Sequence, residues 1–271
     1  MSKEITGALF KQMILHGAAA ITAQKQAIND LNVFPVPDGD TGTNMSMTIA
    51  TAAEALRKAA PSSVGQASSV TASALLQGAR GNSGVILSLL FRGIAKSLKD
   101  RETIDGRDLA IALDFGVAAA YKAVMKPAEG TILTVSRLTA ARAADAARQT
   151  PNDPEAVLEA AIAEGQLALA DTINQNPVLK KAGVVDAGGK GFLVILQGML
   201  DSLRGVPMPE GDSEGEAKVE SKTDYAAIAA EEITFTFDTV FIVRKTSPHK
   251  GLEAFEAYLN SIGDSLVIGE D

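Results

Sequence analysis

The chain has 271 residues, of which 46% are hydrophobic and 21% are charged, so it holds enough apolar material for a folded core. Its 25 Lys and Arg against 33 Asp and Glu give a net charge of −8, which argues against nucleic acid or an anionic membrane as the main partner. The absence of Cys excludes disulfides, thiolate metal sites and a thiol nucleophile. No signal-like N-terminus and no apolar stretch of ~20 residues occurs, so we expect a cytoplasmic protein without an integral membrane segment.

Between residues 4 and 204, apolar residues recur every three or four positions, which is the spacing of amphipathic helices. Ile5, Leu9 and Met13 begin the first of these stripes. Asp153 followed by Pro154 is typical of a helix start, because Asp caps the first turn and Pro fits its first position. The pattern predicts a mainly α fold, an eight-helix antiparallel up-and-down bundle or barrel. After the first stripe, the expected helices are residues 44–59, 64–77, 83–98, 105–124, 131–148, 154–172 and 188–203.

The composition changes after residue 204. Residues 205–232 hold eight acids and two bases, which is typical of a solvated acidic linker. Residues 233–243 are rich in β-branched and aromatic side chains and predict a strand, followed by a helix at 250–262 and a second strand at 265–268. Residues 233–271 are too few to close a core alone. We therefore expect the start of an α/β middle domain that continues past Asp271 or pairs with a second copy in a homodimer.

The segment "NVFPVPDGDTGTNM" (residues 32–45) is the least generic part of the chain. Its prolines and glycines forbid a regular element, so we expect a fixed loop that leads into a helix. Asp38 and Asp40 are separated by one glycine, so both carboxylates can point to the same side of an extended chain. Such a pair repels itself unless a cation lies between, and Mg²⁺ typically takes one or two carboxylates together with phosphate oxygens. The simpler alternative is an Asp-Gly turn that binds no ligand.

Residues 41–44, "TGTN", follow directly, and a Gly/Thr turn at a helix start offers free N–H groups and a positive dipole end to a phosphate. Three further glycine-bearing loops have the same form: residues 78–84 "GARGNSG", in which Ser83 is expected to cap a helix, residues 127–131 "PAEGT" and residues 184–191 "VVDAGGKG". About two helices separate each loop from the next, so an up-and-down chain returns to the same end each time. We therefore expect one composite site, which is neither a P-loop nor a Rossmann site because both signatures are missing.

The motifs "NVFPVPDGDTGTNM", "GARGNSGVILS", "VMKPAEGTILTV" and "GVVDAGGKGF" resemble the nucleotide-binding domain shared by dihydroxyacetone kinases and the ATP-binding subunit of bacterial fatty acid kinase. They cover essentially residues 1–204 in that family's order. The fatty acid kinase branch matches better, because its loop carries "FPVPDGDTGTNM". The resemblance implies a barrel of eight helices that binds Mg-ATP at one rim. It also implies that this chain is similar to an N-terminal piece, or a shortened relative, of the fatty acid kinase subunit.

The resemblance further implies a role for each motif residue. Asp38 and Asp40 would be the catalytic pair, holding two Mg²⁺ ions that bridge the phosphates of ATP or ADP. The dihydroxyacetone kinase pattern has a third metal-binding Asp where this chain has Val33, and the neighbouring Asn32 is the candidate for that metal ligand. The expected nucleotide-binding residues are Thr41, Gly42, Thr43, Asn44, Gly81, Asn82, Ser83, Gly84, Thr131, Ile132, Asp186 and Gly188.

The function that the resemblance implies is an ATP-dependent kinase subunit that phosphorylates the carboxylate of a fatty acid presented by a separate lipid-binding protein, giving an acyl phosphate. A fatty carboxylate is already anionic at neutral pH, so no general base is needed to activate it. Two alternatives stay open. One is a dihydroxyacetone-kinase-like phosphotransfer subunit with tightly bound ADP, and the other is a non-catalytic module that binds nucleotide or lipid.

Overall fold

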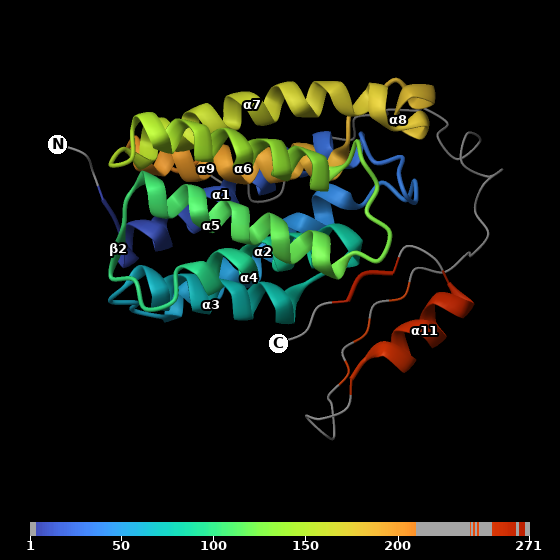
Figure 1. Ribbon diagram of the computed structural model, residues 1–271, viewed down its shortest axis with the longest axis horizontal. Helices are drawn as coiled ribbons and strands as arrows, with labels where there is room; N and C mark the ends of the chain where they lie inside the picture. Colours follow the sequence, from blue (N-terminus) through green and yellow to red (C-terminus); the bar gives the residue numbers. More distant parts are fainter. Residues whose placement is uncertain are drawn as a thin grey trace.

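Figure 1 shows the computed structural model of the chain. The structure describes residues 4–209, 239, 241, 243, 251–263 and 266–268. The expected acidic linker and the expected strand at 233–243 therefore fall mostly outside the described residues. Within residues 4–209, eight long helices are joined by short loops, which confirms the mainly α fold.

The helices begin and end within a few residues of the positions that apolar spacing and capping residues indicate. The first helix is longer than its apolar stripe, and the expected helices at 44–59 and 83–98 each begin two or three residues earlier. A short extra helix, α8, follows the seventh long one. The elements are α1 (Gly7–Asn29), α2 (Thr41–Lys58), α3 (Val64–Gly78), α4 (Gly81–Ser97), α5 (Gly106–Ala123), α6 (Ile132–Gln149), α7 (Pro154–Gln175), α8 (Pro177–Ala182), α9 (Ala187–Leu203) and α11 (Glu253–Ile262), with strands β1 (Ile5–Thr6) and β2 (Thr103–Ile104).

The eight long helices form a closed ring. Each helix from α1 to α7 packs against the next one in the sequence, and α9 packs against both α7 and α1. Helices that follow one another therefore lie side by side, and the last closes on the first, as Figure 1 shows for α1 and α9. The two short strands pair antiparallel, with Ile5 opposite Ile104, and tie the start of α1 to the connection between α4 and α5. An up-and-down order of this kind returns every second loop to the same end of the barrel.

Small residues let neighbouring helices approach closely. A Cβ atom on Gly93 of α4 would lie 2.2 Å from the carbonyl oxygen of Phe115 on α5, and one on Gly198 of α9 would lie 2.7 Å from that of His16 on α1. Any larger side chain at these two positions would force the helix pairs apart. The core between the helices is filled by aliphatic side chains and a few aromatic ones, with Phe10 and Phe91 fully buried.

The C-terminal segment lies against the barrel at one loop. The expected helix at 250–262 is present as α11. Of the expected strand at 265–268 the structure describes residues 266–268, in which Val267 forms an isolated antiparallel bridge with Val124 at the end of α5. Among the described helices, none is both long enough and apolar enough to cross a bilayer.

Candidate functional site

Four loops that are far apart in the sequence line one pocket of about 170 Å³ at one end of the barrel. They are the α1–α2, α3–α4, α5–α6 and α8–α9 connections, so the expected meeting of the four glycine-bearing loops is what the structure shows. Most of the residues that the sequence singled out lie in its wall. These are Asn32, Asp38, Asp40, Thr41, Asn44, Gly81, Asn82, Ser83, Thr131, Ile132, Asp186 and Gly188.

Gly42, Thr43 and Gly84 do not line the pocket, and each has a packing role instead. The backbone N–H of Thr43 donates to Asn29 Oδ1 at 3.0 Å, while Asn29 Nδ2 donates to the Thr43 hydroxyl at 3.0 Å. Gly42 lies against the carbonyl oxygen of Lys25, which a Cβ atom would approach to 2.1 Å. Gly84 lies similarly close to the side chain of a threonine on α2. These residues set the position of α2 against α1 and of α4 against α2.

The two acidic residues of the first loop both line the pocket. Asp40 stands at the N-cap of α2, yet its side chain makes no capping hydrogen bond. Asp38 accepts a hydrogen bond from Asn32 Nδ2 at 3.0 Å. Partial burial, followed by repulsion from Asp40, raises the pKa of Asp38 from its ordinary value to about 6. A bound cation would relieve both effects, because it offsets the negative charge of the pair.

Asn32 holds this loop together. Its amide nitrogen donates to the Val36 carbonyl at 2.6 Å as well as to Asp38, and its amide oxygen accepts from the Thr41 hydroxyl. The amide orientation follows from these partners, since the nitrogen faces two acceptors. In this arrangement Asn32 orients Asp38, and its expected role as a metal ligand stays a prediction.

The donor set fits a hard cation shared with a phosphate. Across the described residues, no cluster of three or more His, Cys, Asp and Glu side chains is placed to enclose a metal. Of the carboxylates that line the pocket, Asp186 accepts a backbone N–H at the start of α9, whereas Asp38 and Asp40 lie together on the first loop. A pair of this kind suits Mg²⁺, because this ion commonly takes one or two carboxylates and completes its shell with water and phosphate oxygens.

Two helices open into the pocket without a cap from the side chain of their own N-cap residue. The N-cap residue of α2 is Asp40 and that of α4 is Arg80, and neither side chain caps its helix. Ser83, the expected cap of α4, lies inside the first turn instead, because the helix already begins at Gly81, so that prediction is wrong. The other helices within residues 4–209 are capped by Thr6, Ser63, Asp105, Thr131, Asp153, Asn176 and Asp186.

The two uncapped N-termini meet. Gly81 has a positive φ of 57°, and a Cβ atom on it would lie 2.6 Å from the side-chain nitrogen of Asn44 in the first turn of α2. The Thr43 N–H is taken by Asn29 Oδ1, but the two helix starts still bring backbone N–H groups and two positive dipole ends together beside Asp38 and Asp40. This arrangement attracts an anion such as a phosphate.

The opposite wall is built from the starts of α6 and α9. Asp186 is buried and caps α9, accepting the N–H of Gly189 at 2.7 Å, and it also accepts the N–H of Ile132. Burial raises the pKa of Asp186 to about 6 despite these bonds. Its carboxylate thus joins two helix starts rather than standing free. The neighbouring wall is mostly apolar and contains Val124, Met125, Ala128, Ile132 and Leu133.

The sequence did not point to every wall residue. Asn260 at the end of α11, together with Leu266 and Val267, closes part of the pocket, although more than 120 residues of chain separate Val267 from its bridge partner Val124. No local pattern marks such a contact. Phe34 and Val36 also line the pocket and lie within the loop that was singled out for its acids.

Residues 35–201 match the family described as the DAK2 domain. The chain belongs to the DAK2 domain family. Protein YloV of Bacillus subtilis is 40% identical over 277 residues, which are 99% of this chain and 50% of that protein. The uncharacterized protein SSP1546 of Staphylococcus saprophyticus is 40% identical over 279 residues, covering 100% of this chain and 50% of that protein. This DAK2 chain therefore spans half the length of these relatives.

The fold is similar to that of a solved kinase. The dihydroxyacetone kinase from C. freundii, in a crystal structure with AMP-PNP and Mg²⁺, aligns with a TM-score of 0.54 and 18% identity, covering 74% of this chain and 35% of that one. The native form of the same enzyme aligns with a TM-score of 0.53. At this identity the likeness establishes the helical DAK2 fold and no more.

Proposed function

We propose that this DAK2 domain is the ATP-binding part of a cytoplasmic kinase that transfers a phosphoryl group to the carboxylate of a fatty acid presented by a separate lipid-binding protein. The observation that carries the proposal is the meeting of Asp38, Asp40 and two helix N-termini whose N-cap side chains make no capping bond in one pocket. Together they provide ligands for a divalent cation beside a phosphate site. The crystal structure of a dihydroxyacetone kinase of similar fold contains AMP-PNP and Mg²⁺, which supports the same ligand class here.

Each part of the pocket would have a separate role in phosphoryl transfer. Asp38 and Asp40 would hold two Mg²⁺ ions, which when bound neutralise charge on the phosphates. The first turns of α2 and α4 would hold phosphate oxygens through backbone N–H groups other than that of Thr43, which donates to Asn29. The apolar wall around Ile132 and Leu133 suits the flat face of a base. No side chain has to remove a proton from the acceptor, because a carboxylate is ionised at neutral pH.

The choice of a fatty acid as acceptor rests on the first loop. Its sequence, "FPVPDGDTGTNM", resembles that of fatty acid kinase ATP-binding subunits more than the dihydroxyacetone kinase form. The pocket of about 170 Å³ is lined by the parts that bind metal and nucleotide, which leaves an acyl chain to be carried by another protein. The partner therefore brings the carboxylate to the pocket rim.

The test is a transfer assay with the chain, ATP labelled in its γ-phosphate, Mg²⁺ and a fatty-acid-binding protein loaded with oleate. We expect label to appear in a hydroxylamine-sensitive acyl phosphate, and we expect Asp38→Asn to abolish the label while its helical circular dichroism stays that of the wild type. Transfer by Asp38→Asn at the wild-type rate would refute the assignment. A matched control is Asp145→Asn, because Asp145 lies on the outer surface at the far end of α6.

The fold similarity to dihydroxyacetone kinase supports a second candidate, a phosphotransfer subunit that keeps ADP bound as a cofactor. The two candidates differ in nucleotide exchange. If the purified chain releases a stoichiometric amount of ADP on denaturation and does not exchange it for labelled ATP, the second candidate replaces the first. Rapid exchange supports the kinase.

A further inference from the structure

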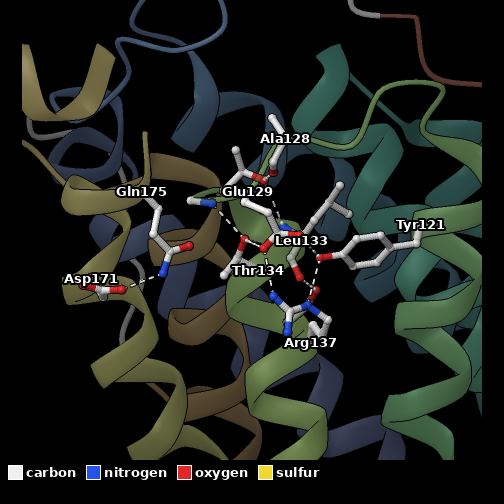
Figure 2. Close-up of polar contacts among 11 residues, drawn as sticks. Tyr121, Ala128, Glu129, Leu133, Thr134, Arg137, Asp171 and Gln175 are labelled. Atoms are coloured by element: carbon white, nitrogen blue, oxygen red, sulfur yellow. Dashed lines mark hydrogen bonds and ion pairs between the residues drawn. The ribbon is translucent and has the colours of Figure 1, made fainter. Parts of the chain in front are cut away.

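The α5–α6 loop, residues 124–131, has no regular secondary structure and yet forms a large part of the pocket wall. The side chain of Glu129 does not line the pocket and points instead toward Tyr121 of α5 and Arg137 of α6 (Figure 2). The loop residues that line the pocket are Val124, Met125, Lys126, Ala128 and Thr131.

Glu129 joins the loop to both flanking helices. The Tyr121 hydroxyl of α5 donates to Glu129 Oε1 at 3.1 Å, and the Thr134 hydroxyl and Arg137 Nη2 of α6 contact Glu129 Oε2 at 2.7 and 2.8 Å. Arg137 Nε also donates to the Tyr121 hydroxyl at 3.2 Å, which closes a triangle of side chains (Figure 2). The Thr134 hydrogen bond, and then Arg137, hold the pKa of Glu129 below its ordinary value, so the carboxylate is ionised at neutral pH.

The same network fixes the backbone of the loop. The N–H of Gly130 donates to the Thr134 hydroxyl at 2.8 Å, so one hydroxyl holds both the main chain of Gly130 and the side chain of Glu129. Gly130 has a φ of 74°, and a Cβ atom on it would lie 3.0 Å from the backbone nitrogen of Asn176. The next residue, Thr131, caps α6 and faces the pocket. The position of the pocket wall therefore depends on contacts made outside the pocket.

Global stability does not account for this network. The side chains of Arg137 and Glu129 are 45% and 53% exposed, and ion pairs exposed to this degree add little to the stability of a fold. Their effect is local, because an irregular loop loses most of its conformational freedom when both of its ends and its middle are fixed. When the pocket wall is already ordered in the free protein, ligand binding does not have to offset the entropy cost of ordering it, and the affinity is higher.

We infer that Tyr121, Glu129 and Arg137 are positioning residues that hold the α5–α6 loop in the form that binds nucleotide. The inference rests on the proposed function, in which a nucleotide occupies the pocket. None of the three side chains lines the pocket, so each acts through Thr131 and its neighbours.

The test compares Glu129→Gln, Arg137→Gln and the double variant with the wild-type chain. We expect each single variant to weaken Mg-ADP binding roughly five-fold, measured by calorimetry, because the loop is no longer ordered in advance. The double variant should bind as weakly as each single one, since the two side chains act as a unit. Hydrogen exchange of peptides covering residues 124–131 should become faster, while exchange in α2 stays unchanged.

The matched control is Arg148→Gln, which breaks a more exposed ion pair with Asp145, at 2.7 Å, at the other end of the same helix and far from the loop. It should change neither affinity nor loop exchange. Wild-type binding and loop exchange in Glu129→Gln would overturn the inference. If the wild-type chain itself binds no nucleotide, the proposed function fails. Hydrogen exchange then tests the positioning role by itself: faster exchange of the loop in Glu129→Gln supports that role, and unchanged exchange refutes it.

Discussion

Asp186 makes the stability of the barrel depend on pH. Its carboxyl group is buried between the starts of α6 and α9, where it accepts the backbone N–H groups of Gly189 and Ile132. Asp186→Asn removes the negative charge and keeps one carbonyl oxygen for a backbone N–H group. The variant therefore separates the charge of Asp186 from its capping role.

The size of the effect follows from the raised pKa. Burial moves the pKa of Asp186 from 3.8 to about 6 in the folded chain. At about 1.36 kcal/mol for each pH unit, the difference of roughly two units amounts to about 3 kcal/mol. The folded state binds the proton more tightly than the unfolded state, so the contribution of Asp186 to stability is greatest below pH ~4 and is lost as the pH rises to ~6. Above that pH, Asp186 is ionised in both the folded and the unfolded state, so its effect on the free energy of unfolding no longer changes with pH.

The assay is urea unfolding of the wild-type chain and Asp186→Asn from pH 4 to pH 8 without nucleotide. A lost hydrogen bond would lower the free energy of unfolding of the variant by the same amount at every pH. The informative quantity is therefore the change with pH in the difference between the unfolding free energies of the two proteins. That difference should shift by about 3 kcal/mol in favour of the variant between pH 4 and pH 7. A difference that is the same at every pH would refute the buried, proton-binding role of Asp186.

Three further variants test other parts of the structure. Gly81→Ala puts a side chain at a positive φ and close to Asn44, so we expect a loss of about 1 kcal/mol in urea unfolding and weaker nucleotide binding in calorimetry. Phe91→Ala empties a fully buried position and should lower the free energy of unfolding by about 3–5 kcal/mol. Val267→Asp places a charge in the pocket wall beside Val124 and should weaken nucleotide binding about ten-fold, while the unfolding midpoint of the barrel hardly changes. Unchanged affinity would show that the C-terminal segment does not contribute to the pocket.

The helices of the barrel could be predicted from the sequence because their signals are local. Apolar spacing gives the buried face, and residues such as Asp153 with Pro154 mark a start that the structure reproduces at Pro154. The short helix Pro177–Ala182 was not predicted, because six residues are too few to show a period. The strand residue Ile5 was placed in the first helix, since its pairing with Ile104 depends on a distant segment.

The candidate site could be predicted as a set of loops but not as a set of contacts. Asp40 and Asp186 both precede a helix, and the sequence gives no means of telling that the Asp186 side chain caps its helix whereas that of Asp40 does not. The role of Thr43 depends on Asn29 of the preceding helix. Val267 reaches the pocket through a bridge to Val124 that only the folded chain defines.

Magnesium-linked nucleotide binding tests the central claim most directly. In calorimetry with ADP, we expect the affinity of the wild-type chain to fall at least ten-fold when EDTA replaces Mg²⁺, and we expect Asp40→Asn to lose this dependence while keeping its helical content. Equal affinity with and without Mg²⁺, or a magnesium dependence in Asp40→Asn like that of the wild type, would contradict the account.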